Sequence, residues 1–186
     1  MNFFREMTMI RPYNGIEPTI DATAFVDPMA MVAGDVRIGA HSSIWPFVSA
    51  RGDIHFISIG DYSNIQDNSA LHVTPIEHPV VIGNYVTIGH GVILHGCSIG
   101  NNCLIGMGAI MLDGSEVGDN ALLAAGSLLP EGKKVPAGWL ALGTPAKPIR
   151  KLKDEEIVMI KKNAEEYCEM AKRHLDAIKK MENKRN

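Results

Sequence analysis

The chain has 186 residues, of which 46% are hydrophobic and 21% are charged, and its formal net charge is −3. This composition is typical of a soluble globular protein with one well-buried core and at most a small appendage. The slightly acidic balance argues against a nucleic-acid-binding protein. The three cysteines include no Cys-x-x-Cys pair, so they predict neither a disulfide framework nor a zinc knuckle, and they suit a reducing compartment.

The N-terminal segment has charged residues between all of its short apolar runs, as residues 1–12 show. This pattern argues against a signal peptide or a membrane span at that end. We therefore expect a cytoplasmic protein that binds neither membranes nor nucleic acids.

Aliphatic residues recur every six positions along most of the chain, with only three breaks in phase. A small or β-branched residue usually stands four places after each of them, and glycine often follows directly. Any apolar chain has some residues six apart by chance. Twenty such positions, each usually followed four places later by a small or β-branched residue, exclude that explanation. We call these positions rungs. They are Ile20, Val26, Val32, Ile38, Ile44, Ala50, Phe56, Ile59, Ile65, Leu71, Ile82, Ile88, Leu94, Ile99, Ile105, Met111, Val117, Leu123, Leu129 and Val135.

A period of six fits neither an α-helix nor a hairpin sheet, but it fits the hexapeptide β-helix, whose short strands wind and stack around a common core. The rungs should point into this core, and the glycines should lie at corners that need permissive backbone angles. Cys97 and Cys103 then pack in the core. We expect residues 1–150 to form the β-helix domain with a connector.

The proline-rich connector occupies residues 136–150, and a helix follows from Asp154. Acidic residues open this helix, and Lys179, Lys180, Lys184 and Arg185 close it, as the helix dipole favours. Its apolar stripe predicts packing along the side of the β-helix, in the same subunit or in a neighbour, so residues 151–186 form a C-terminal helical unit. The stripe consists of Ile157, Ile160, Ala164, Tyr167, Ala171, Leu175 and Ile178.

Several polar residues have fixed places relative to the rungs, and these places should face outward. Gln66, His72, His95 and Arg51 directly follow a rung, whereas Asp67 and His90 lie two places after one. All lie near the loop of residues 73–81, where the ladder is interrupted.

Three histidines without a thiolate suit a catalytic metal site, because three neutral imidazoles leave one position of zinc open and make hydroxide available at neutral pH. The alternative is that each histidine is a solvated residue or a solitary acid–base group, and spacing alone favours this simpler interpretation.

The series Arg51-Gly-Asp53, Asn64-Ile-Gln66-Asp67, His72, Gly89-His90 and His95-Gly96 resembles the signature of γ-class carbonic anhydrases. The resemblance extends over the coils, the Gly143-Thr-Pro-Ala-Lys147 connector and the C-terminal helix. It implies an all-β left-handed parallel β-helix with a C-terminal α-helix, a homotrimer, and a metal between subunits.

The resemblance also implies roles for individual residues. His72 and His95 would bind zinc (Zn2+) from one chain and His90 from its neighbour, and iron(II) or cobalt(II) suits the same imidazoles. Gln66 would orient the hydroxide or the substrate. Arg51, Asp53 and Asp67 would form a charged network in which Arg51 attracts bicarbonate, although a purely structural ion pair is the main role that we expect for Arg51 and Asp53. Tyr167 would reach toward the metal or simply pack.

The sequence departs from this family in two places. Ile54 stands where well-characterised members have a glutamate, and the loop after His72 is short. Only Glu77 and His78 in this loop are candidates for proton transfer, which carbon dioxide hydration requires.

The leading hypothesis is therefore zinc-dependent, reversible hydration of carbon dioxide to bicarbonate. A hexapeptide acyltransferase with one histidine as general base, a CoA-thioester hydrolase, and a weakly active or non-catalytic homologue remain as alternatives.

Overall fold

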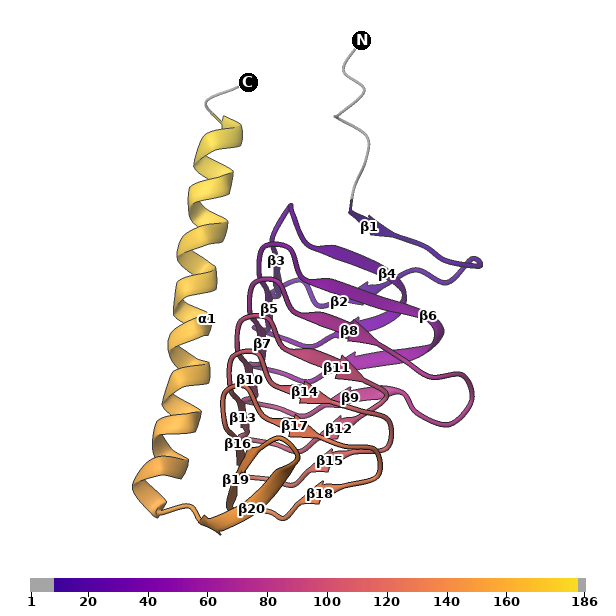
Figure 1. Ribbon diagram of the computed structural model, residues 1–186. Coiled ribbons are helices and arrows are strands. Elements are labelled where there is room, and N and C mark those ends of the chain that lie inside the picture. Colours follow the sequence, from indigo (N-terminus) through magenta and orange to yellow (C-terminus); the bar gives the residue numbers. More distant parts are fainter. Residues whose placement is uncertain (1–8, 184–186) are drawn as a thin grey trace.

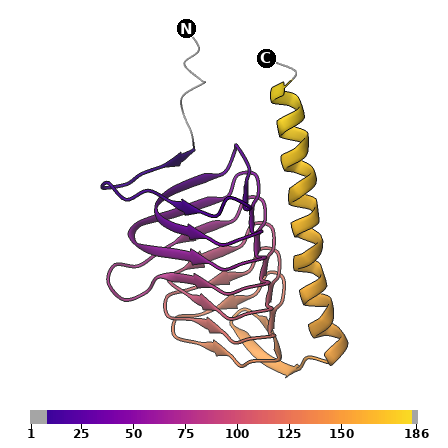
Figure 2. The same ribbon diagram turned by 180° about the vertical axis from the view of Figure 1, so that it is seen from behind.

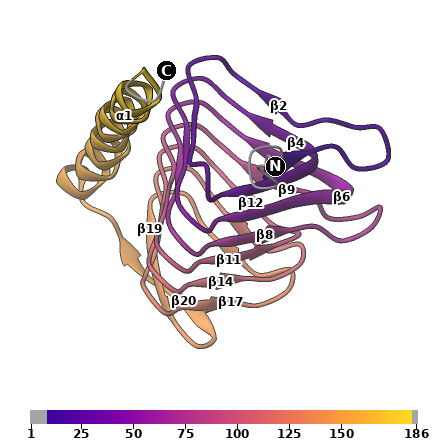
Figure 3. The ribbon, with the colours of Figure 1, turned by 90° about the horizontal axis from the view of Figure 1, so that it is seen from above.

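The six-residue period winds the chain into a β-helix with three faces, which appears as a triangle when seen along its axis (Figure 3). The structure is a computed structural model and describes residues 9–183. The strands pair in parallel between successive coils, and the coils stack in chain order from the N-terminal end to the C-terminal end (Figure 1). The expected left-handed β-helix with a C-terminal α-helix is confirmed.

One face of the β-helix is covered on its outside by the long C-terminal helix, and we call it the helix-covered face. It ends in the single antiparallel pair among the assigned strands. It consists of β3 (Phe25–Val26), β5 (Ser43–Ile44), β7 (Asn64–Ile65), β10 (Thr87–Ile88), β13 (Leu104–Ile105), β16 (Leu122–Leu123), β19 (Trp139–Gly143) and the antiparallel β20 (Ala146–Lys151).

The histidine face follows next in each coil and the polar face comes third. The histidine face contains β8 (Ala70–His72), β11 (Ile93–His95), β14 (Ile110–Met111) and β17 (Leu128–Leu129). The polar face contains β9 (Val80–Ile82), β12 (Ser98–Ile99), β15 (Glu116–Val117) and β18 (Lys134–Val135). Two longer strands, β4 (Met31–Ile38) and β6 (Ser49–Ile59), run from one of these faces into the other, and β1 (Ile10–Arg11) and β2 (Thr19–Ile20) pair with β4.

The core consists of the rungs together with the small residues between them, as expected. All rungs from Val32 onward are buried except Phe56. The expectation for Phe56 is wrong because β6 continues as one long strand through the corner, and this excursion shifts the inward position to Ile57, which is fully buried. The Phe56 ring instead packs outside, 4.9 Å from the guanidinium carbon of Arg37.

Both expected core thiols are buried, and burial raises the pKa of Cys97 and of Cys103 to about 12. At neutral pH both thiols are therefore protonated and pack in the core. They lack reactivity there, because the reactive form of cysteine is the thiolate.

The glycines that directly follow rungs were expected to provide positive φ angles, but the structure requires them because there is no space for a side chain. Gly60 does not adopt a positive φ, but a Cβ atom on it would lie 2.4 Å from Asn84 Oδ1 and 2.6 Å from the carbonyl oxygen of Gly83. The neighbouring coil therefore leaves no room for a side chain there. Positive φ occurs instead three places after a rung, as at Tyr62 and Tyr85, whose rings stack with centroids 4.8 Å apart.

Helix α1 (Asp154–Asn183) runs back along the helix-covered face of its own chain and contacts β3, β5, β7 and β10 (Figure 2). Trp45 anchors the contact, with edge-to-face centroid distances of 5.7 Å to Tyr167 and 5.6 Å to Phe25. The expected basic residues Lys184 and Arg185 lie outside the described residues. The described part of the chain contains no helix with the length and hydropathy that a bilayer span requires.

Candidate functional site

His72 and His95 meet on the histidine face because β8 and β11 pair in register one coil apart. The pairing aligns Arg51, His72 and His95 on three successive coils. The ring centroids of the two histidines are 5.2 Å apart, and His72 Nδ1 lies 3.2 Å from His95 Nε2. The expectation that these residues face outward is confirmed, since both are only partly buried.

Each of these rings has a carboxylate at its other nitrogen. His72 Nε2 lies 3.2 Å from Asp53 Oδ1, and His95 Nδ1 lies 2.6 Å from Asp113 Oδ1. A neutral imidazole that donates one N–H to a carboxylate has only a lone pair at its second nitrogen. When both rings are neutral, two lone pairs therefore face each other and repel, and either a proton or a metal ion between them relieves this repulsion.

A metal ion fits between these two nitrogens. Two ligands of a tetrahedral metal at 2.0–2.1 Å have nitrogen atoms about 3.3 Å apart, and the observed separation is 3.2 Å. Histidines that bind metals usually have a carboxylate or carbonyl at their other ring nitrogen, and both of these rings have a carboxylate there.

Asp53 joins His72 to Arg51, with which it forms an ion pair. Burial favours the neutral form of Asp53, but hydrogen bonds from Arg51 and His72 outweigh it and hold the pKa of this carboxyl below its ordinary value. Arg51, Asp53, His72 and His95, together with Asp113, form what we call the first half-site.

His90 lies elsewhere, at the corner where the chain turns from β10 into β11. Its Nδ1 is 3.1 Å from Asp67 Oδ2, so it too has a carboxylate at one ring nitrogen. The five residue steps from His90, at the start of this face, to His95, at the end of β11, span up to roughly 17 Å when extended. The two histidines therefore stand at opposite edges of the histidine face.

Gln66 and Tyr167 lie beside this corner. Gln66 follows its rung and points out of the coil as expected, but it is not exposed: α1 covers it and leaves it 4% exposed. Burial and the negative charge of Asp67 raise the pKa of the Tyr167 hydroxyl against an opposing interaction with Gln66. Gln66, Asp67, His90 and Tyr167 form what we call the second half-site.

A buried chain of hydrogen bonds holds Gln66 in place. Gln66 Nε2 donates to Asn64 Oδ1 at 3.1 Å, Asn64 Nδ2 donates to Thr87 Oγ1 at 2.9 Å, and Thr87 Oγ1 donates to Asn163 Oδ1 at 3.0 Å. The last residue belongs to α1, so docking of the helix and orientation of the Gln66 amide depend on each other.

The expected metal ligands do not converge within one chain. In the described part of the chain, no three His, Cys, Asp or Glu side chains come together to hold a metal ion. The structure brings together His72 and His95, with Arg51 and Asp53, and separately His90, with Gln66, Asp67 and Tyr167.

Sequence reasoning missed Asp113, which has a detectable signal. It lies 18 residues after His95, and one coil of this β-helix takes about that many residues, as the pairing of Leu94 with Met111 shows. Thr74, Thr87 and Asn163 were missed because only the loop path and the docked helix bring them to the two half-sites.

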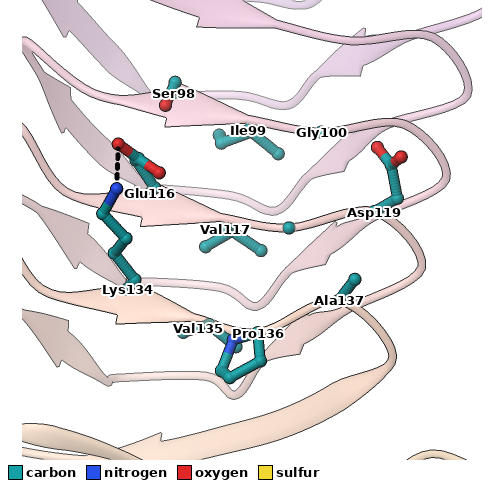
Figure 4. A pocket seen from close by; sticks show the side chains of 11 residues that line it. Ser98, Ile99, Gly100, Glu116, Val117, Asp119, Lys134, Val135, Pro136 and Ala137 are labelled. Carbon is teal, nitrogen blue, oxygen red and sulfur yellow. Dashed lines mark ion pairs between the residues drawn. The ribbon is translucent and has the colours of Figure 1, made fainter.

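The loop of residues 73–81 borders a groove of about 640 Å³ beside the first half-site. Thr74, Glu77, His78 and Asp113 contribute to its lining. A separate groove of about 480 Å³ crosses the polar face (Figure 4). The side chains of Glu116 and Lys134 form an ion pair there at 2.8 Å, and none of the half-site residues lines it.

Comparison with known proteins agrees with this architecture. Residues 96–130 match the model "Bacterial transferase hexapeptide (six repeats)", and residues 79–109 match "Hexapeptide repeat of succinyl-transferase". The chain is 48% identical to "Protein YrdA" of Escherichia coli over 90% of this chain and 95% of that protein. It is also 48% identical to "Carbonic anhydrase" of Geobacillus kaustophilus over 87% of this chain and 88% of that protein.

Among solved structures, a hexapeptide transferase family protein from Anaplasma phagocytophilum superimposes with a TM-score of 0.85 at 44% identity. The match covers 89% of this chain and 97% of that one. The names of these relatives thus include both an anhydrase and a transferase. These names do not decide between the two reactions, whereas the chemistry of the half-sites distinguishes them.

Proposed function

Because the chain belongs to the γ-class carbonic anhydrase family, we propose that it catalyses the reversible hydration of carbon dioxide to bicarbonate at a site shared between two subunits of a homotrimer. The observation that carries this proposal is the pair of facing nitrogens, His72 Nδ1 and His95 Nε2, each on a ring whose other nitrogen meets a carboxylate.

The division of the site into two half-sites supports the proposed homotrimer. The two half-sites lie at opposite edges of one face, so a neighbour that docks its second half-site on the first supplies the third histidine. The same contact repeats around a ring and closes under three-fold symmetry, as heterologous interfaces do when their rotation closes.

The outward-facing residues of the two faces that α1 leaves uncovered differ in polarity, and this difference supports the proposed assembly. On the histidine face, Ile93, Ile110 and Leu128 align on successive coils, and Ile93 is 44% exposed. On the polar face the equivalent ladder is Ser98, Glu116 and Lys134 (Figure 4). Exposed apolar surface of this kind marks an interaction site.

Apolar residues also flank the second half-site along its corner. Phe47 is 59% exposed on the coil before Asp67, and Met107 is 60% exposed on the coil after His90. An apolar rim on both half-sites would exclude water from the polar groups between them.

The metal ligands are then His72 and His95 from one subunit and His90 from the next. When bound there, a zinc ion lowers the pKa of water to about 7, an effect for which carbonic anhydrases are the reference case. Iron(II) and cobalt(II) fit the same imidazole set, since affinity alone does not separate these metals.

The remaining residues act on the substrate and the ligands. Gln66, fixed through Asn64, presents an amide that orients the reacting oxygen, and the Arg51 guanidinium attracts bicarbonate. Asp53 and Asp67 hold His72 and His90 in position, and Tyr167 closes the site from α1. Hydration of carbon dioxide also releases one proton, for which Glu77 and His78 are the acceptors in the loop beside the first half-site.

An acyltransferase with a single general base is the competing function, since a His95–Asp113 pair also suits that role. The second imidazole, with its lone pair aimed at the first, favours the metal site, because a general base needs no ligand cage.

Metal analysis of protein purified without oxygen, followed by a carbon dioxide hydration assay with and without chelator, tests the proposal. We expect bound metal and chelator-sensitive hydration. Protein that retains no zinc, iron or cobalt would contradict it, as would acyl transfer from acetyl-CoA that persists in chelator.

A further inference from the structure

Asp113 makes two hydrogen bonds that join separate parts of the structure. Its Oδ1 lies 2.6 Å from His95 Nδ1, and its Oδ2 accepts from Thr74 Oγ1 at 2.7 Å. Thr74 stands at the base of the 73–81 loop, where its backbone N–H donates to the carbonyl of His78 at 3.0 Å. The carboxylate is therefore held on one side by the loop and holds the imidazole on the other.

The backbone leaves space for this carboxylate. A Cβ atom on Gly96 would lie 2.4 Å from Asp113 Oδ1, so only glycine after His95 allows Asp113 to reach the ring. Gly96 also has a φ of 54°, which L-residues with side chains rarely adopt.

The charge of Asp113 suits an acceptor. An aspartate carboxyl has an ordinary pKa of about 3.9 and is ionised at neutral pH. An ionised carboxylate accepts hydrogen bonds and donates none, so His95 must donate from Nδ1.

We propose that Asp113, oriented by Thr74, is the positioning residue of His95 and fixes this ring with Nδ1 protonated and Nε2 free toward His72. The consequence for metal affinity rests on the proposed function, whereas the consequence for the ring tautomer does not. Carboxylates behind metal-binding histidines typically contribute 10- to 100-fold to metal affinity.

The test compares Asp113→Ala and Asp113→Asn with Asp119→Ala in the full-length protein. Asp119 is a matched control, because its Oδ1 also accepts a hydrogen bond from the preceding coil, at 2.6 Å from the backbone N of Asn101, but it lies on the polar face (Figure 4). Long-range ¹H–¹⁵N spectra of the metal-free proteins report the tautomer of each histidine, and competition with a chelating dye gives the dissociation constant for zinc.

We expect His95 to be protonated at Nδ1 in the wild type and in Asp119→Ala, and to lose this single tautomer in Asp113→Ala. Zinc binding should weaken about 10- to 100-fold in Asp113→Ala. Asp113→Asn should weaken it less, since one acceptor oxygen remains, and it carries the test if Asp113→Ala does not fold.

The proposal fails if folded Asp113 variants keep the His95 tautomer and the zinc affinity of Asp119→Ala. If the wild type binds no zinc but the tautomer still depends on Asp113, the proposed function fails and the positioning role stands.

Discussion

His72 Nδ1 and His95 Nε2 face each other at 3.2 Å across two coils, with Asp53 and Asp113 behind the two rings. Parallel pairing of β8 with β11 creates this relationship, because it places both residues at the same position after a rung.

Replacing either His72 or His95 by alanine should reduce bound zinc to background and abolish carbon dioxide hydration. Each variant keeps only two of the three imidazoles, one from each chain, and two are too few to hold zinc tightly. Atomic absorption on the purified variants measures the metal. His41→Ala is the control, because His41 contacts the ring of Tyr62, with centroids 4.9 Å apart, and belongs to neither half-site. Full zinc content in the His95 variant would remove it from the ligand set.

Gln66 should contribute to turnover without holding the metal. Gln66→Leu is expected to keep zinc and to lower kcat/KM on the order of 10²-fold, the loss typical when one oriented polar group is removed from a reacting oxygen. Stopped-flow hydration assays measure this. Tyr167→Phe serves as the comparison, because it removes only the hydroxyl that interacts with Gln66 and retains the ring that packs on Trp45. Loss of zinc from Gln66→Leu would contradict this role for Gln66.

Asp53 links the first half-site to acid stability. Its pKa is lower in the folded protein than its ordinary value of about 3.9, so the stability that it contributes is present above about pH 4 and is lost as the pH falls through the lowered value. The free energy of unfolding of Asp53→Asn should therefore differ from wild type at pH 6 and converge with it at low pH. Urea titrations at one fixed protein concentration check this, and a difference independent of pH down to pH 2 would contradict it.

The rung pattern predicts opposite effects for neighbours in β9. Ile82 is 2% exposed and Val81 is 37% exposed. Ile82→Ala should lower the free energy of unfolding by about 2–5 kcal/mol, whereas Val81→Ala should change it by less than about 0.5 kcal/mol. Chemical denaturation of the two variants measures both values, and similar losses would mean that the inward register is misassigned.

Most of the fold was predictable from the sequence, because in a β-helix the period itself determines which residues face inward. The period failed at Phe56, where the long strand β6 shifts the register, an effect that no local spacing reveals. The glycines were located correctly but for the wrong reason, since the need for space at Gly60 comes from a neighbouring coil more than twenty residues away.

The candidate site was predictable only in part. His72, His95 and His90 were identified through a family resemblance, because their spacing alone favoured unrelated histidines. The burial of Gln66 depends on α1, which lies about a hundred residues later in the chain and docks over it. Asp113 belongs to the site only through the stacking of coils, which a search for local motifs does not detect.

The claim that the site is shared between subunits has a direct test in mixed trimers. Co-expression of differently tagged His90→Ala and His95→Ala chains, purified through both tags, yields trimers in which one of the three sites has all its histidines. We predict about one third of the wild-type zinc content and activity for these trimers, with neither in each variant alone. Trimers that mix His72→Ala with His95→Ala serve as the control and should stay inactive, because both changes fall in the same half-site. Absence of any recovery in the first pair would contradict a site built from two subunits.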